Sequence, residues 1–128
     1  MAEITPETVS TAALAYLGDS VTELWVRRRL VTSGISSAGK LNEMALGYVR
    51  ATEQSAALKR MLPHLTEEEA AVFRRGKNID HHSMPKSASQ KEYREATGFE
   101  TVFGYLYLKG MNDRIDELLT LAYSEEQL

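Results

Sequence analysis

Hydrophobic positions along this chain recur with the period of α-helices rather than that of strands. The strongest pattern covers residues 10–32, and Gly34 follows it as a good left-handed helix terminator. Its apolar positions are spaced three, four and seven residues apart and would share one stripe: Leu14, Leu17, Val21, Leu24 and Val31. Before it, Thr5-Pro6-Glu7 combines a capping residue, a first-turn proline and a first-turn acid, which predicts an additional helix start.

Capping residues and breakers divide the rest of the chain into further helices. We expect these at about 36–46, 52–62, 66–76, 89–110 and 112–123, separated by a loop over residues 77–88. Residues 66–69 and 89–92 have the capping-box pattern, while Pro63 and Gly76 mark helix ends. The sequence therefore predicts one all-α domain over residues 1–128, with six to seven helices and no internal repeat.

Composition narrows the class of protein. The chain is 43% apolar and 26% charged, as in an ordinary globular domain, and no apolar run approaches the ~20 residues that cross a bilayer. The first residues show neither the basic segment nor the apolar core of a secretory signal. Without cysteine there is no disulfide framework and no thiolate zinc site. We therefore expect a cytoplasmic protein with no membrane association.

Two acidic residues, Asp19 and Glu100, each lie inside an otherwise apolar, helix-forming stretch. A carboxylate is costly to bury alone, and two brought together would repel each other and could hold a hard divalent cation. That combination points toward phosphoryl-transfer chemistry. Simpler interpretations exist, because Asp19 fits an exposed position on an amphipathic helix and Glu100 could pair with an arginine.

Other candidate residues carry weaker signals. Glu23 lies one turn after Asp19, where it could approach a metal-bound water, but its own i+4 neighbour Arg27 offers a simple ion pair. The three histidines, His64, His81 and His82, lack the spacing of a zinc site. The tyrosines at 16, 105 and 107 fit a core or an interface better than a base-stacking platform.

Positive charge gathers in residues 74–86, which we call the basic strip. Its four cations, Arg74, Arg75, Lys77 and Lys86, outweigh the single acid Asp80 by +3, whereas the whole chain carries −3. Together with Asn78, these side chains could contact phosphate and 2′-hydroxyl groups, and Gly76 would permit close backbone approach. Alternatively, the cations simply offset the dipole at a helix carboxyl end.

Taken together, three blocks of the sequence resemble the ribonuclease III family. Leu17-Gly18-Asp19-Ser20-Val21 is similar to the signature around the family's catalytic aspartate. Gly98-Phe99-Glu100 with its apolar continuation is similar to the second metal-ligand helix. Between them, Arg75-Gly76-Lys77-Asn78 stands where the family has a Gly-Lys loop. The order and spacing of the blocks agree over nearly the whole chain.

Two departures point to one branch of that family. Ala15 stands where the usual signature has a glutamate, and Thr97 where it has an aspartate. These losses, the short length and the lack of a double-stranded-RNA-binding domain are similar to Mini-ribonuclease III, in which the catalytic domain stands alone. The departures leave open how many metal ions bind and which groups complete their coordination.

The resemblance implies a homodimeric endonuclease that hydrolyses double-stranded RNA with Mg²⁺ and matures the paired ends of the 23S ribosomal RNA precursor. In that assignment Asp19 and Glu100 are the metal-binding catalytic residues, and Arg74, Arg75, Lys77, Asn78 and Lys86 bind RNA. The exact cleavage site and the need for a ribosomal protein stay open. Two alternatives remain: a weakly active scaffold that binds RNA or the ribosome, motivated by Ala15 and Thr97, and a helical protein-interaction module.

Overall fold

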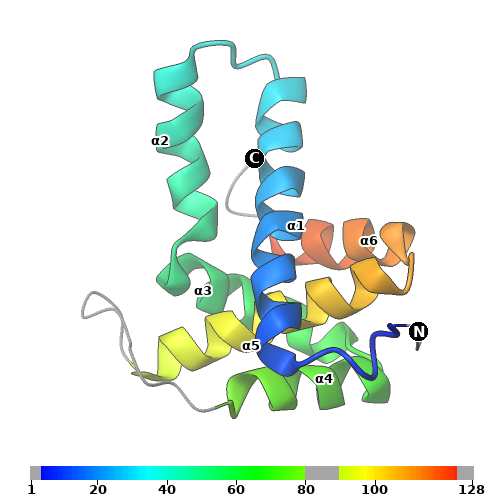
Figure 1. Ribbon diagram of the computed structural model, residues 1–128. Coiled ribbons are helices and arrows are strands. Elements are labelled where there is room, and N and C mark those ends of the chain that lie inside the picture. The colour runs from blue at the N-terminus through cyan, green and yellow to red at the C-terminus, as the bar shows by residue number, and fades with distance from the viewer. Residues whose placement is uncertain (1–3, 80–89, 124–128) are drawn as a thin grey trace.

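A computed structural model describes residues 4–79 and 90–123 and shows an all-helical architecture (Figure 1). The elements are α1 (Thr11–Thr32), α2 (Ala38–Val49), α3 (Ala51–Met61), the 3₁₀ turn η1 (Leu62–His64), α4 (Glu67–Lys77), α5 (Gln90–Leu108) and α6 (Asn112–Ala122). Within these described ranges there is no strand, and no helix is both long and apolar enough to span a membrane. The predicted all-α class with six to seven helices is confirmed.

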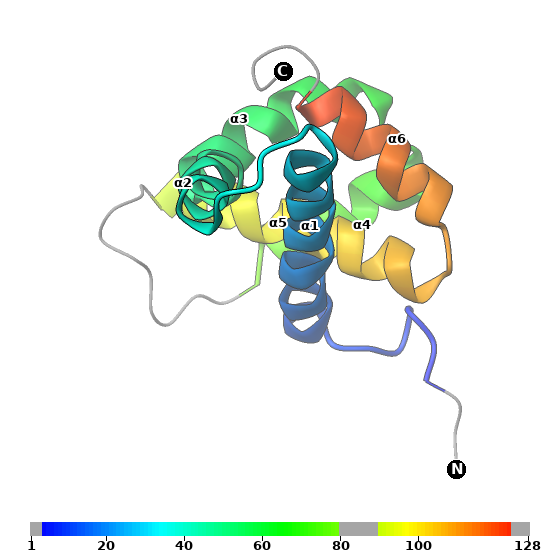
Figure 2. The ribbon, with the colours of Figure 1, turned by 90° about the horizontal axis from the view of Figure 1, so that it is seen from above.

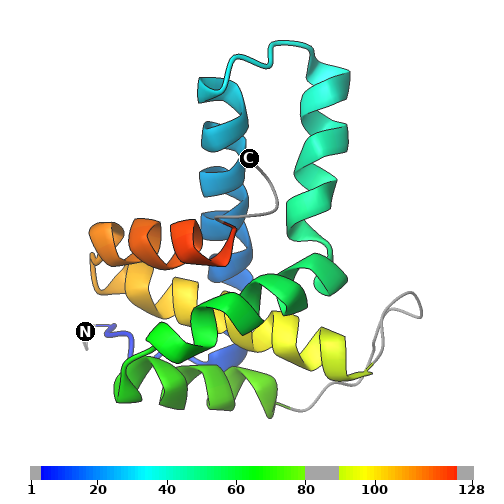
Figure 3. The ribbon, with the colours of Figure 1, turned by 180° about the vertical axis from the view of Figure 1, so that it is seen from behind.

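Helix α5 is the centre of the fold. Every residue from Thr101 to Leu106 is buried, and so are all five from Glu95 to Phe99. Helix α1 crosses α5 on one side, α4 packs beneath it, and α3 and α6 cover the other side (Figures 1 and 3). Phe99 and Phe103 of α5 meet edge to face with ring centroids 5.0 Å apart, at the middle of the core.

The second half of α1 and the whole of α2 form an antiparallel pair that extends above α5 (Figure 1) and is seen nearly end-on in Figure 2. Gly34, with φ of +99°, follows α1 in the left-handed conformation that glycine adopts without strain. The Ser37 side chain then accepts a hydrogen bond from the Lys40 N–H and caps α2. The predicted end of α1 and start of α2 are therefore confirmed.

Three local predictions are wrong. Residues 6–8 form a turn rather than a helix start, because the true cap of α1 is Ser10, whose side chain accepts from the Ala13 N–H. Helix α4 does not end at Gly76 but continues to Lys77. The buried face of α1 includes small residues such as Ala15 and Gly18, while Leu24 of the expected stripe is 69% exposed. Large apolar side chains alone therefore mislead about which face is covered.

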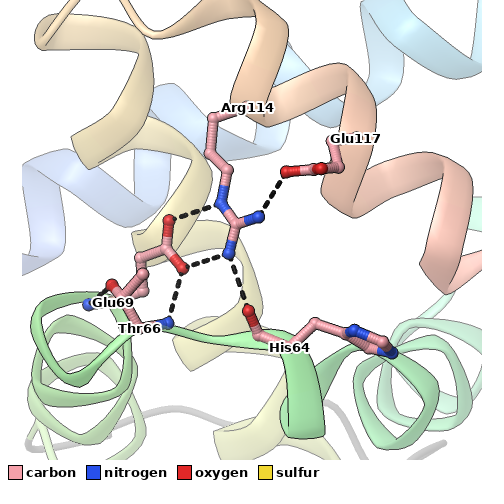
Figure 4. Close-up of polar contacts among 5 residues, drawn as sticks. All are labelled: His64, Thr66, Glu69, Arg114 and Glu117. Atoms are coloured by element: carbon pink, nitrogen blue, oxygen red, sulfur yellow. Dashed lines mark hydrogen bonds and ion pairs between the residues drawn. The ribbon is translucent and has the colours of Figure 1, made fainter.

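The start of α4 is fastened to α6 by Arg114 (Figure 4). The capping box predicted at residues 66–69 is present, with Thr66 and Glu69 exchanging hydrogen bonds. Arg114 donates hydrogen bonds to the buried Glu69 carboxylate from Nε at 2.8 Å and from Nη2 at 2.7 Å. Its Nη2 also donates to the His64 carbonyl. A two-pronged contact with a further backbone bond gives the carboxylate the partners that burial requires. The contact between Arg114 and Glu69 therefore joins α4 to α6.

Candidate active site

Two glycines set the crossing of α1 and α5. A Cβ atom placed on Gly18 would lie 1.6 Å from the Glu100 carbonyl oxygen, and one on Gly104 would lie 1.9 Å from the Leu14 carbonyl oxygen. No side chain fits at either position, so the two backbones touch directly. Because Asp19 follows Gly18, its carboxylate is carried to the part of α5 that bears Glu100.

Asp19 and Glu100 lie in one pocket of about 230 Å³. Its remaining lining comes from α1, from α5 and from Ile79 just after α4: Ala12, Ala15, Tyr16, Ile79, Tyr93 and Thr97. Asp19 is exposed at the mouth, whereas Glu100 is only partly accessible. The small side chains Ala12 and Ala15 leave room beside Asp19. The two acids singled out in the sequence are therefore neighbours in space.

The pocket disfavours the negative charge of Glu100. Burial, the neighbouring charge of Asp19 and a hydrogen bond with Asp19 together raise the pKa of Glu100 to about 9. A hydrogen bond from Gln54 acts in the opposite direction, but it is weaker. The alternative in which an arginine neutralises Glu100 is not borne out, since the groups that set its pKa among the described residues are Asp19 and Gln54. At neutral pH the pair carries a proton or needs a cation.

Gln54 is the site residue that sequence reasoning missed. Its side chain is 2% exposed, and its Nε2 lies 3.5 Å from Glu100 Oε2. A signal did exist, because Gln54 shares the buried face of α3 with Leu58 and Met61, at spacings of four and seven residues. A polar amide on an apolar face needs a polar partner. The identity of that partner depends on how α3 packs, which the pattern does not reveal.

The described residues contain no group of three or more histidine, aspartate or glutamate side chains placed to hold a metal ion. Ala15 and Thr97 both line the pocket, so the two positions without acids face the same space as Asp19 and Glu100. The Thr97 hydroxyl donates to the Tyr93 carbonyl at 2.9 Å within its own helix. Any cation in this pocket would therefore meet two protein carboxylates, with its other positions open to water or substrate oxygens.

Several other candidate residues have simple environments. Glu23 pairs with Arg27 at 2.8 Å on the surface of α1, as its i+4 spacing indicated. Tyr105 is buried, as expected of a core aromatic, and Tyr107 is 49% exposed. Tyr16 is 83% exposed at the rim of the pocket and is not a core residue. His81 and His82 lie outside the described residues.

The described part of the basic strip forms the last turn of α4. Arg74 and Arg75 are exposed, Lys77 is half-buried, and Asn78 caps the helix. Arg75 Nη2 donates to Thr11 Oγ1 at 3.0 Å, which brings this cation to the start of α1, one residue from Ala12 of the pocket. The strip therefore lies near the pocket without lining it, and its cations also lie where they offset the α4 dipole. Lys86 lies outside the described residues.

One property expected of the strip is wrong. Gly76 does not offer its backbone to a ligand, because it is buried against α5. A Cβ there would lie 2.2 Å from the Thr101 hydroxyl and 2.9 Å from the Gly98 Cα. The glycine instead permits close packing of α4 on α5.

A second pocket, of about 330 Å³, lies between α1 and the junction of α5 and α6. Its lining combines apolar side chains with four polar or charged ones: Leu17, Ser20, Val21, Leu24, Trp25, Arg28, Tyr107, Asn112, Ile115 and Asp116. The exposure of Leu24 and Tyr107 leaves an apolar surface on this side of α1. It is separate from the carboxylate pocket, with which it shares no lining residue.

Comparison with known proteins gives matches in sequence and in overall fold to one family. The model of the ribonuclease III domain matches residues 12–111. A Mini-ribonuclease 3 of Symbiobacterium thermophilum is 47% identical over 117 residues, covering 91% of this chain and 90% of that protein. One from Enterococcus faecalis is 41% identical over 109 residues, covering 84% and 83%. The crystal structure of protein FN1578 from Fusobacterium nucleatum superimposes with a TM-score of 0.82 at 31% identity, covering 91% and 93%.

Proposed function

Because the chain belongs to the ribonuclease III family, in its Mini-ribonuclease 3 branch, and is an endoribonuclease of that type, we propose that it hydrolyses double-stranded RNA with Mg²⁺. We also propose that it acts in the cytoplasm on the paired ends of the 23S ribosomal RNA precursor. The observation that carries the proposal is the meeting of Asp19 and Glu100 in one pocket. Two carboxylates that repel each other there suit a cation rather than an uncharged ligand.

The donor set fits Mg²⁺. This ion prefers carboxylate oxygens, usually one or two from the protein, and keeps several waters that substrate phosphate can replace. Asp19 and Glu100 would hold it, and when bound it would supply an activated water and neutralise charge on the scissile phosphate. The high pKa of Glu100 means that its proton must leave before the carboxylate can bind a cation.

Different residues of the chain would bind the metal and the RNA backbone. Asp19, exposed at the mouth, faces the arriving phosphate, while Glu100 lies deeper and is held by its helix. We assign contact with the RNA backbone to five residues: Arg74, Arg75, Lys77, Asn78 and Lys86. This assignment is supported by Arg75, which contacts Thr11 at the start of α1, next to the pocket. Phosphate contacts of this kind position a duplex without reading its sequence.

The experiment that tests the proposal is cleavage of a plain RNA duplex by residues 1–128 alone. With Mg²⁺ we expect staggered double cuts that leave 5′-phosphate and 3′-hydroxyl ends, and with a chelator we expect none. RNA that is bound but not cleaved at saturating Mg²⁺ would favour the scaffold alternative. That alternative was suggested by Ala15 and Thr97, which line the pocket without supplying a carboxylate.

We further propose that the protein is a homodimer formed through the apolar pocket beside α1. Leu24 and Tyr107 are 69% and 49% exposed there, next to Trp25 and Val21. A twofold contact through this surface would bury apolar area that a monomer leaves in water. It would also give the assembly two carboxylate pockets, one for each strand of a duplex.

Light scattering should report a particle of twice the 14.3 kDa mass of one chain at micromolar concentration. Leu24→Glu should convert it to the monomer, because the substitution places a charge in the proposed contact. Leu46→Glu is the matched control, since Leu46 is 47% exposed on α2 and lines none of this pocket. A monomeric parent protein, or a dimer that survives Leu24→Glu, would rule this contact out.

The basic strip should set the salt dependence of RNA binding. Arg75→Gln and Lys77→Gln should each weaken binding to a duplex and reduce the slope of log K against log salt by about one unit, as expected for one lost phosphate contact. Lys40→Gln, in the first turn of the projecting α2, should leave that slope unchanged. Equal slopes for all four proteins would show that the strip does not contact RNA.

A further inference from the structure

Three helices meet at the Glu100 carboxylate. Asp19 approaches from α1, Glu100 itself belongs to α5, and the amide of Gln54 comes from α3. Gln54 is 2% exposed, and the other residues on its face of α3 include the fully buried Leu58 and Met61. The amide is therefore a polar group inserted from an apolar helix face, and its Nε2 lies within 3.5 Å of Glu100 Oε2.

Packing alone does not explain an amide at this position. A buried amide without a hydrogen-bond partner costs free energy, whereas methionine would fill a similar volume beside Leu58 and Met61 at no such cost. The neighbouring Ser55 shows the same arrangement with a different partner, because its hydroxyl donates to the buried Glu95 carboxylate at 2.7 Å. Helix α3 thus places two donors in succession against two acids of α5.

We propose that Gln54 is the positioning residue of the Glu100 carboxylate, holding one of its oxygens against α3 so that the group faces the pocket shared with Asp19. This inference rests on the proposed function, because it assigns Gln54 to the same metal-binding pair. A neutral donor behind a metal ligand fixes the rotation of that ligand without adding charge to the site. Such support is useful where only two carboxylates line the pocket and neither Ala15 nor Thr97 offers another.

The test measures metal binding in the absence of RNA. Gln54→Met keeps the length of the side chain and removes the donor, and Gln54→Asn keeps an amide that is too short to reach Glu100. By titration calorimetry with Mg²⁺ or Mn²⁺, each should bind about 10- to 100-fold more weakly than the parent protein. The metal concentration that gives half-maximal RNA cleavage should rise by the same factor, while the rate at saturating metal stays within a few-fold.

Two further proteins separate positioning from general damage. Ser55→Ala removes the adjacent buried donor, whose partner is Glu95, and should bind metal as the parent does. In a Glu100→Gln background, Gln54→Met should cause no additional loss of metal affinity, because the group that it orients is gone.

The inference is overturned if parent protein and Gln54→Met share one metal affinity, or if Ser55→Ala weakens binding as much as Gln54→Met does. A parent protein that cuts RNA but shows either result refutes the role of Gln54 alone. A parent protein that neither binds the metal nor cuts refutes the proposed function, and this inference with it.

Discussion

Asp19→Asn and Glu100→Gln should each reduce the rate of duplex RNA cleavage by about three orders of magnitude, equivalent to about 4 kcal/mol of transition-state stabilisation. Both substitutions keep the shape of the side chain and remove the charge that would hold the metal. Since the two acids share one pocket, the double variant should be only slightly slower than either single variant. Initial rates on a defined duplex at saturating Mg²⁺ provide the measurement.

Glu23→Gln is the matched control, because Glu23 lies one turn from Asp19 on α1 and is paired with Arg27. It should cut the duplex within a few-fold of the parent rate. RNA binding by the Asp19→Asn and Glu100→Gln variants should persist in a gel-shift assay, since the basic strip is intact. Near-parental cutting by either of those two variants would exclude the proposed mechanism.

Glu100→Gln should also change how the free energy of unfolding depends on pH when no metal is present. The ordinary pKa of 4.5 rises to about 9 for Glu100 in the folded protein. The folded state therefore holds a proton that the unfolded chain releases, so the associated stability is complete below pH 4.5 and is lost as pH rises toward 9. Urea unfolding at pH 5 and pH 8 with a chelator should show a smaller loss for Glu100→Gln than for the parent protein.

Gly18→Ala should destabilise the protein by about 3 kcal/mol or more. The added methyl group would lie 1.6 Å from a backbone oxygen of α5, and backbone cannot move aside as the end of a flexible side chain can. The helices must separate, which also moves Asp19 away from Glu100. Urea unfolding should therefore show a lower midpoint, and any folded protein should cleave RNA more slowly than the parent protein.

Gly47→Ala provides the opposite result from the same chemical change. Gly47 lies within α2, and a Cβ there would meet nothing within 4 Å. Alanine favours the helix over glycine by about 0.5–1 kcal/mol, so this variant should be more stable than the parent protein. If Gly18→Ala were as stable as Gly47→Ala, the direct backbone contact between α1 and α5 would be disproved.

The helices could be predicted from local signals because caps and breakers act within a few residues. Ser37, Thr66 and Gly34 each perform the role that their type and position indicated. Burial could not be predicted so well. The covered face of α1 carries Gly18 because α5 comes too close for larger residues, while Leu24 is left exposed. Such a choice depends on a partner helix some eighty residues further along the chain.

The candidate site could likewise be predicted only in part from the sequence. Periodicity alone would class Asp19 as an ordinary exposed acid, and its side chain is indeed exposed. What sets it apart is the neighbour Glu100, and similarity to a known family was needed to connect the two. Gln54 and the packing role of Gly76 escaped prediction because both depend on how α3 and α4 lie against α5.

The crossing of α1 and α5 has a consequence for the protein during its synthesis. Ribosomes deliver a chain from its N-terminus, so α1 to α4 emerge while the α5 segment is still inside the exit tunnel. Until α5 docks through Gly18 and Gly104, Asp19 has no second carboxylate beside it and the proposed cation site does not exist. A nascent chain would thus lack the proposed cation site until α5 has left the ribosome, and nuclease activity would begin only after α1 and α5 have packed together.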